Sequence, residues 1–174
     1  MPAKTPRCGL ADNEDAGCGQ LSAGDCQSRL LVAPELLLEG EFNEAVAEAA
    51  IATFLGRAIE FDAIFATDDE SAWGAMTALR AAGRRVPEDV AIAGFDDGLL
   101  SRHLTPALTT VHAPIQEAGC RAAEMLLCAI HARDHGRVSE GTAAIVLPTH
   151  LVVRGSCGCS GGEQSIALPA HATP

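Results

Sequence analysis

Short, continuous apolar runs are the feature of this chain that most constrains its fold. Three of them, residues 61–67 (FDAIFAT), 90–95 (VAIAGF) and 107–111 (ALTTV), are separated by segments with helical spacing. A run of this length without polar alternation is typical of a strand that is buried on both faces. Such strands, alternating with helices, indicate a parallel sheet covered by helices. The sequence therefore predicts an α/β domain, with a parallel sheet flanked by helices.

The segments beside these runs have the spacing of amphipathic helices. Apolar residues recur every three or four positions in residues 41–57, 70–83 and 115–134, and residues 97–104 can form a shorter helix. In the second of these helices we expect Trp73 to be a core residue. Gly74, next to it, has no side chain beyond hydrogen and would let a neighbouring element approach closely.

The rest of the chain divides into weaker segments. Residues 30–40 could hold strand fragments, and residues 143–154 are expected to form two short strands around Pro148. Residues 1–28 are rich in Gly, Asp and Cys without any period, and we expect them to be irregular or disordered. The predicted organisation is this irregular start, one domain over residues 29–157, and a flexible tail over residues 158–174.

Charge and hydropathy exclude several classes of partner. The formal net charge of the 174 residues is -11, which repels a phosphate backbone, so the chain alone is expected not to bind DNA. No apolar run approaches the ~18 residues of a membrane helix, and no membrane partner is expected. The basic residues near the start are not followed by the apolar segment of a secretory signal. A cytoplasmic protein is the resulting expectation.

The cysteines do not predict a disulfide framework or a cofactor. There are seven of them, an odd number, and no secretory signal accompanies them. The only close pair is the C-x-C of Cys157 and Cys159, which could bind a metal but is read here as a pair of free thiols. We therefore expect no cofactor and no metal.

Two pairs of acids follow two of the predicted strands. Asp68 and Asp69 come after the strand over residues 61–67, and Asp96 and Asp97 come after the next strand. In an open parallel sheet, ligands bind beyond the carboxyl ends of the strands, so both pairs should border one crevice. We expect the first acid of each pair to meet the ligand and the second to cap the following helix.

Other interpretations of the four acids remain open. All four could be helix caps, which are common in loops between strands and helices. Paired acids could also hold magnesium for phosphoryl transfer, or form the two carboxylates of a glycosidase. A small carboxylate- or metal-dependent α/β enzyme is thus the alternative function. The sequence has no GxxxxGK phosphate loop and no D-x-D to support it, and we expect no enzyme.

Several motifs, in order and with fitting spacing, carry a resemblance to a known family. They are AIFATDD, RVPEDVAIAGFDD, PALTTVHAP with Gly119 after it, and LPTHLVVRGS. These stretches resemble the ligand-sensing domain of the lactose-repressor-like (LacI/GalR) transcription regulators. The resemblance implies a periplasmic-binding-protein-like fold, in which a sugar or another small effector lies between two α/β lobes. It implies that Asp68 and Asp96 contact the effector and that Ile115 lines the pocket.

The resemblance covers about residues 30–157, which is only part of that family's pattern. Residues 1–28 match neither its helix-turn-helix nor its first lobe. The chain is thus expected to hold mostly one lobe plus a segment that returns to the other. The implied function is sensing of a small-molecule effector, a sugar by preference, with DNA contacted only through a missing N-terminal part. A sensor fragment of a signalling protein and a non-functional fragment are the alternatives.

The resemblance also bears on self-association. It assigns the helix over residues 115–134 to the missing lobe, on whose sheet its apolar face would normally pack. Several hundred Å² of exposed apolar surface would cost on the order of 10 kcal/mol, which is comparable to the stability of a whole domain. A homo-oligomer that covers this helix is therefore expected.

Overall fold

The computed structural model describes residues 33–57, 59–134, 144–159 and 162–168. The chain order of its elements is η1 (Pro34–Leu36), α1 (Glu44–Leu55), β1 (Ala63–Phe65), α2 (Asp69–Ala81), β2 (Ala91–Asp96), α3 (Leu99–His103), β3 (Thr109–His112), α4 (Ile115–Asp134), β4 (His150–Val153), η2 (Gly155–Cys157) and β5 (Gln164–Ala167). The predicted start over residues 1–28 lies outside the described residues.

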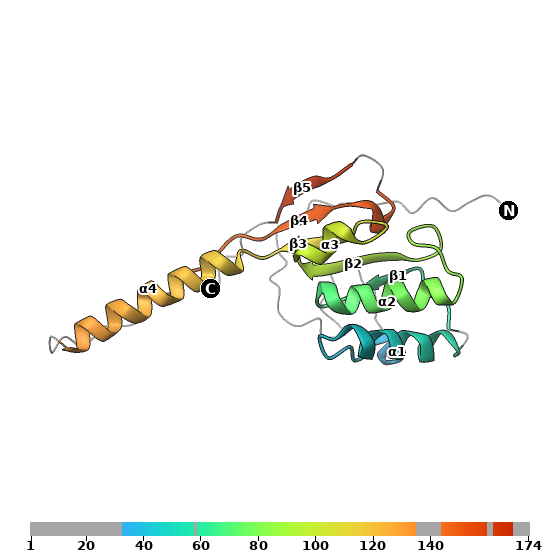
Figure 1. The fold of residues 1–174 in the computed structure, drawn as a ribbon, viewed down its shortest axis with the longest axis horizontal. Helices are drawn as coiled ribbons and strands as arrows, with labels where there is room; N and C mark the ends of the chain where they lie inside the picture. Colours follow the sequence, from blue (N-terminus) through green and yellow to red (C-terminus); the bar gives the residue numbers. More distant parts are fainter. Residues whose placement is uncertain (1–32, 58, 135–143, 160–161, 169–174) are drawn as a thin grey trace.

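The strands form one sheet in the order β1-β2-β3-β4-β5 (Figure 1). β1, β2 and β3 are parallel, whereas β4 pairs antiparallel with β3 and β5 pairs antiparallel with β4. The predicted α/β fold is confirmed, and its parallel part is formed by the three strands that the apolar runs predicted. The antiparallel edge of β4 and β5 was not predicted.

Two helices cover one face of the parallel strands. α2 packs on β2, and α1 packs closely along α2. Gly74 in α2 makes this possible, because a Cβ at this position would lie 2.2 Å from the Glu44 carbonyl oxygen of α1. The expected close approach at Gly74 is therefore confirmed. Trp73 is only partly buried, and the core is aliphatic instead. Its most buried members are Ala72, Leu79, Val90, Ile92 and Leu108.

Coverage of the sheet on both faces is not complete in the described residues. Along β1, Ile64 packs against the core, but Ala63 and Phe65 point to the opposite face and are exposed. Phe65, the larger of these two residues, is 52% exposed. The apolar run over residues 61–67 thus predicted a strand correctly but overestimated its burial, because a short edge strand can keep one apolar face open.

Three further expectations need correction. Residues 33–40 contain no strand: Pro34 begins the short 3-10 helix η1, for which a fixed φ is well suited. Between residues 143 and 154 one strand forms instead of two, since the described residues 144–149 are irregular. The tail predicted over residues 158–174 contains a strand at residues 164–167, where β5 satisfies the outer edge of β4. Residues 160–161 and 169–174 lie outside the described residues.

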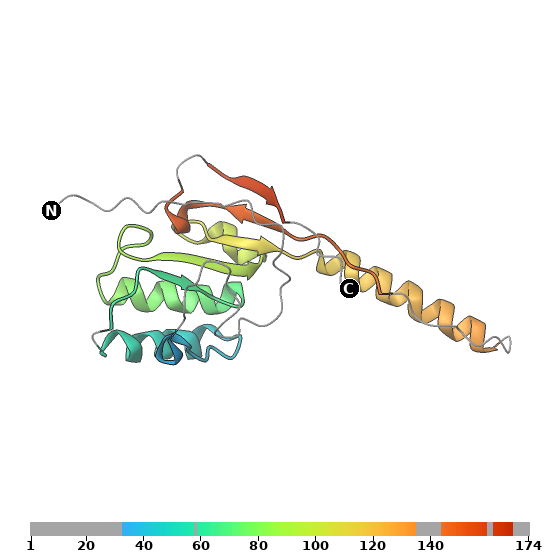
Figure 2. The ribbon, with the colours of Figure 1, turned by 180° about the vertical axis from the view of Figure 1, so that it is seen from behind.

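α4 is an arm that leaves the body of the molecule. Views from opposite sides show it extending from the end of β3, with the chain returning along it toward β4 (Figures 1 and 2). None of its residues is buried, and Ile115, Leu126, Leu127 and Ile130 are exposed apolar residues. Its bounds are those predicted from the helical spacing.

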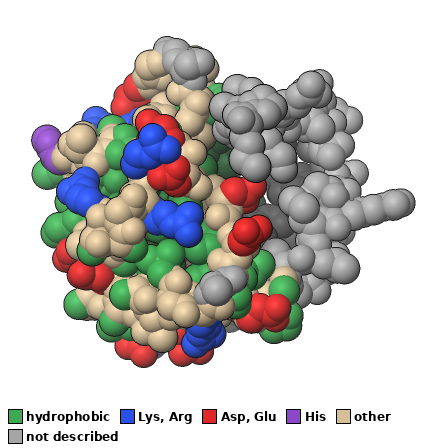
Figure 3. All heavy atoms as spheres, turned by 90° about the vertical axis from the view of Figure 1, so that its right-hand side faces the viewer, with side chains coloured by type: hydrophobic (Ala, Val, Ile, Leu, Met, Phe, Trp, Pro, Cys, Tyr) green, Lys and Arg blue, Asp and Glu red, His purple; other side chains and the backbone are tan. Residues whose placement is uncertain are grey.

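Surface charge is mixed on the side of the molecule that faces away from α4. There, basic and acidic side chains are interspersed among apolar and neutral groups (Figure 3). A nucleic-acid-binding stripe would instead gather basic side chains on one face. Among the described helices, none is both long enough and apolar enough to span a membrane.

Candidate functional site

The register of the parallel strands brings the two acid pairs to the same edge of the sheet. Phe65 of β1 is the partner of Ala93 of β2, so Asp68 and Asp96, each three residues further on, stand at the same height. Neighbouring strands are ~4.8 Å apart, which places the two pairs beside each other at the carboxyl ends. Burial raises the pKa of Asp96, and the charge of Asp68 adds to this effect, as expected for two close carboxylates. The shared edge predicted from the sequence is confirmed.

Asp68 is the cap of α2. Its Oδ1 accepts a hydrogen bond of 2.8 Å from the Ser71 backbone N–H, and its Oδ2 accepts one of 2.6 Å from the Ser71 hydroxyl. The Thr67 hydroxyl lies 3.4 Å from the same Oδ2. Asp68 is 5% exposed. The expectation that Asp69 caps this helix and leaves Asp68 for a ligand is therefore wrong in its first half. The cap needs an extended backbone at the residue before the helix, and Asp68 has it.

Asp69 ties α2 to the next two strands. Its Oδ1 accepts a hydrogen bond of 2.6 Å from the Thr110 hydroxyl of β3, and its Oδ2 accepts one of 2.8 Å from the Gly98 N–H. Burial raises the pKa of the Asp69 carboxyl, and the charges of Asp96 and Asp97 add to this effect, against the two hydrogen bonds. This carboxylate holds the loop after β2 in place.

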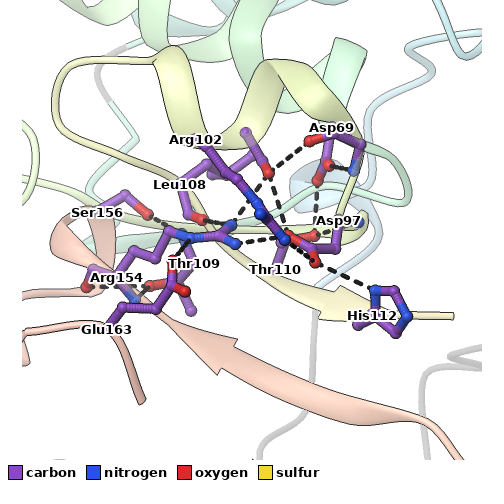
Figure 4. A network of polar contacts seen from close by, with 12 residues as sticks. Asp69, Asp97, Arg102, Leu108, Thr109, Thr110, His112, Arg154, Ser156 and Glu163 are labelled. Carbon is purple, nitrogen blue, oxygen red and sulfur yellow. Dashed lines mark hydrogen bonds and ion pairs between the residues drawn. The ribbon is translucent and has the colours of Figure 1, made fainter. Parts of the chain in front are cut away.

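Asp97 is the centre of a buried ionic network (Figure 4). Its Oδ1 lies 2.6 Å from Arg154 Nη2, and both side chains are only 3% exposed. Its Oδ2 lies 3.1 Å from His112 Nδ1 and 3.3 Å from Arg102 Nη2. Burial opposes the charged form, but these hydrogen bonds and the charge of Arg154 outweigh it and lower the pKa of Asp97. A structural role for Asp97 is confirmed, although the cap position of α3 is Gly98.

Arg154 connects this network to the rest of the sheet. Its Nη1 donates to the Ser101 hydroxyl and to the Leu108 carbonyl oxygen, each at 3.0 Å. Its Nε donates to Glu163 at 2.6 Å, next to the start of β5. Five donors on a planar guanidinium allow one side chain to hold the loop after β2, the start of β3 and the β4–β5 connection together.

Asp96 is the acid that the network leaves free. It is exposed, and no hydrogen bond reaches its carboxylate from the described residues. Its φ of 102° and the φ of 51° at Asp97 place two consecutive non-glycine residues in a region that L residues rarely adopt. Such strain persists only where the surroundings enforce it, and the fixed side chain of Asp97 does so here.

Ile115 stands near the same edge. His112, the last residue of β3, pairs directly with Asp96, and Ile115 follows three residues later as the first residue of α4. Its side chain is 64% exposed. The structure thus brings the predicted Asp68, Asp96 and Ile115 to one end of the sheet, and it leaves Asp96 and Ile115 accessible.

The chain matches a model of the "periplasmic binding protein-like domain" family over residues 26–157. The chain belongs to this family. It is 40% identical over 121 residues to the transcriptional regulator CelR of Thermobifida fusca, which covers 70% of this chain and 34% of that protein. The curated relatives that the chain matches are transcriptional regulators, GalR among them, and not enzymes. The resemblance of the sequence motifs to the LacI/GalR family is therefore confirmed.

Solved structures extend this comparison. A complex of the transcriptional regulator CelR with cellobiose has a TM-score of 0.64 at 37% identity, covering 72% of this chain and 37% of that one. A LacI-family regulator from Enterococcus faecalis V583 with bound ribose has a TM-score of 0.61 at 31% identity, covering 68% and 42%. The chain therefore spans roughly a third to two fifths of the length of the relatives it matches.

In the described part of the chain, the candidate site is the carboxyl edge of the sheet, where Asp96 and Ile115 are exposed. A hollow beside α1, lined by Leu38, Val46 and Arg57 among others, includes neither Asp68 nor Asp96. Among the described residues, no group of three or more His, Cys, Asp or Glu side chains is placed to hold a metal ion. The edge offers oxygen acceptors and an apolar side chain to one side of a ligand.

Sequence reasoning missed the residues that hold this edge in place. Arg154, Thr110 and His112 support the loop of Asp96 and Asp97 from two other strands. A usable signal existed for Arg154 alone: it is an isolated charge directly after the apolar run of β4, and a charge so placed needs a buried partner.

Proposed function

We propose that this chain is the effector-binding part of a LacI/GalR-type transcription regulator and that its effector is a sugar. The observation that carries the proposal is the state of Asp96. Among four acids at the carboxyl edge, Asp68, Asp69 and Asp97 are held by protein donors, whereas Asp96 is exposed and receives no side-chain hydrogen bond from the described residues. A carboxylate that is rigidly positioned and unpaired is suited to accept hydrogen bonds from the hydroxyls of a sugar.

Each of the three proposed ligand-binding residues has a distinct part. Asp96 accepts hydrogen bonds from sugar hydroxyls. Asp68, whose oxygens already serve the α2 cap, contributes its negative charge and borders the ligand from β1. Ile115 supplies apolar surface to the ring carbons, as ligand sites combine apolar lining with few polar groups. The relatives with bound cellobiose and ribose support a sugar as the ligand class.

A thermal-shift and calorimetry series tests this function. The chain is titrated with cellobiose, ribose and other mono- and disaccharides, since a ligand that binds only the folded state raises the melting temperature. At ~100 times its Kd such a ligand adds about 2.7 kcal/mol of stability. Asp96→Asn should weaken the response of the sugar that binds at least tenfold. The proposal fails if no sugar in the series shifts the melting temperature.

Asp62→Asn provides a matched control for that series. Asp62 is also an exposed aspartate, but it precedes β1 and therefore lies at the opposite end of the strand from Asp68. The same change of charge at this position should leave sugar binding unchanged. Equal loss of binding in both variants would indicate a general electrostatic effect and would contradict a site at the carboxyl edge.

The proposed function also concerns partners and location. We propose that the regulator acts in the cytoplasm, where its DNA is, and that DNA is contacted by a part outside this chain. The arm α4, with the exposed residues Ile115, Leu126, Leu127 and Ile130, supports a homo-oligomer that covers this surface. Sedimentation tests whether the chain forms this homo-oligomer, and a monomer at tens of micromolar would contradict it. The double variant Leu126→Glu, Ile130→Glu should dissociate the oligomer into monomers.

A further inference from the structure

Two cysteines, separated by one residue, follow strand β4 and lie apart from the proposed effector site. Cys157 ends η2, and Cys159 follows after Gly158. Neither residue is part of a disulfide, and both are partly exposed. The Cys157 thiol lies 3.5 Å from the carbonyl oxygen of Arg154, the residue whose side chain holds Asp97.

The backbone between them is bent in a way that suits a disulfide. Consecutive Cα atoms are ~3.8 Å apart, so an extended C-x-C would place its outer Cα atoms close to the upper limit of ~6.8 Å for a bridge. Gly158 instead has a φ of 78° and a ψ of 4°, a left-handed turn that brings its two neighbours closer. The two side chains already interact, since the thiol of Cys159 hydrogen-bonds to that of Cys157.

We propose that Cys157 and Cys159 are a redox-active dithiol, which a low-molecular-weight disulfide of the glutathione type oxidises to an intramolecular disulfide. The left-handed Gly158 sets the spacing, and both cysteine residues are partly exposed, which gives the oxidant access. A disulfide in so short a ring is strained, and strained, accessible disulfides are the ones that are easily reduced again.

Cys157 is the attacking residue of the pair. Burial opposes its charged form, but hydrogen bonds with Thr109 and with the backbone and thiol of Cys159 outweigh burial and lower the pKa of Cys157. A thiolate is the nucleophile in disulfide exchange, so this environment increases the reactive fraction near neutral pH.

The reaction balances in two exchange steps. The Cys157 thiolate attacks one sulfur of the small disulfide RSSR, which forms a Cys157–S–S–R mixed disulfide and releases one thiolate RS⁻. Cys159 then loses its proton to solvent, and its thiolate attacks Cys157 Sγ, which releases the second RS⁻. The protein gives up two electrons and two protons, and the small disulfide is reduced to two thiols.

Cys120 and Cys128 serve as internal controls. Both are exposed on α4. They are eight residues apart, and the helical rise separates them by ~12 Å, which is too far for a disulfide within one helix. They can form mixed disulfides with the small thiol, but they cannot resolve them within the chain.

Mass spectrometry after thiol alkylation tests the proposal on the full chain. The reduced protein is equilibrated in glutathione buffers from reducing to oxidising, alkylated and digested with trypsin. Cleavage after Arg154 gives the peptide of residues 155–174, which contains Cys157 and Cys159 and no other cysteine. We expect this peptide to carry two alkyl groups in the reducing buffers and none in the oxidising buffers. Its oxidised form should be lighter by two hydrogen atoms than the reduced peptide without alkyl groups. Peptides with Cys120 or Cys128 should instead carry an alkyl group or a glutathione.

Two single variants make the test specific. Cys159→Ser should stop the reaction at the mixed disulfide, so that Cys157 carries glutathione in the oxidising buffers. In Cys157→Ser, the remaining thiol of Cys159 should form its glutathione adduct more slowly than Cys157 does in the wild-type chain, at a rate similar to that of Cys120. The proposal is overturned if the peptide of residues 155–174 keeps two alkyl groups in every buffer. It is equally overturned if both cysteines accumulate as glutathione adducts in the wild-type chain.

Discussion

The two acid pairs at the carboxyl edge have the same sequence but divide their work differently. In the pair after β1, both acids are buried and both serve the fold: Asp68 caps α2, and Asp69 fastens the loop after β2. In the pair after β2, Asp97 is fixed by Arg154, while Asp96 is exposed on a strained backbone. Identical dipeptides at equivalent positions therefore have different roles, because the partners that reach them come from other strands.

Removal of the partner of Asp97 should have the largest effect on this comparison. Arg154→Met removes the only buried counter-charge that the described residues offer to a carboxylate that is itself only 3% exposed, and it leaves the exposed Arg102 as the remaining arginine partner. Loss of a buried partner typically costs about 3–5 kcal/mol of unfolding free energy. Urea denaturation measures the loss. Arg85→Met is the control, because Arg85 forms an exposed pair with Asp89, and its loss should be far smaller. Equal losses would show that Arg154 does not hold the second pair.

The cap of the first pair should be the next largest contribution. Asp68→Ala removes the acceptor of the Ser71 N–H and hydroxyl and should cost about 1–2 kcal/mol of unfolding free energy. Asp68→Asn keeps one acceptor and should recover part of the loss. Asn43→Ala, at the exposed cap of α1, should cost about 0.5–1 kcal/mol. A larger loss at Asn43 than at Asp68 would contradict the importance of the buried cap.

Acid titration should separate Asp69 from Asp97. The pKa of Asp97 is lowered in the folded state, so its stabilising contribution is complete above the unfolded pKa of ~3.9 and is lost as pH falls through the folded value. The pKa of Asp69 is raised, so its charged form costs stability above its folded pKa, and this cost disappears as pH falls toward ~3.9.

Each of these groups changes the pH slope of the unfolding free energy by at most ~1.4 kcal/mol per pH unit. As pH falls below ~4, protonation of Asp97 should lower the stability, and Asp97→Asn should make this fall less steep. As pH falls toward ~4, protonation of Asp69 should raise the stability, and Asp69→Asn should make this rise less steep. Chemical denaturation at a series of pH values measures both slopes. The same response from both variants would remove the difference between the pairs.

The smallest effect on stability is expected at Asp96. Asp96→Ala removes no side-chain hydrogen bond to the described residues and should change the unfolding free energy by less than about 0.5 kcal/mol. Asp96→Gly relieves the φ of 102° and should raise stability by about 0.5–1 kcal/mol. Both variants should lose the sugar response. A loss of stability above 1 kcal/mol in either would assign Asp96 to the fold like the other three acids.

The sequence was sufficient to predict the frame of this edge. The apolar runs located β1, β2 and β3, and the acids directly after the first two runs predicted a shared edge, because parallel strands end on the same side. The division of roles could not be predicted. Arg154, the buried partner of Asp97, lies 57 residues away, and nothing local distinguishes Asp68 from Asp69 as the cap. β5 was missed because its sequence, QSIA, is too short and too polar to indicate a strand without its partner.

The pairing of β3 with β4 indicates where the chain can be shortened by a deletion. His112 and His150 face each other across an antiparallel ladder, and their rings are 4.6 Å apart. The chain thus departs at one residue and comes back at the residue opposite, as the two arms of a hairpin do. Deleting residues 113–149 and joining the ends with a two-residue Asn-Gly turn would close that hairpin. The result would be a minimal lobe that retains Asp68, Asp96 and the Arg154 network and carries no arm.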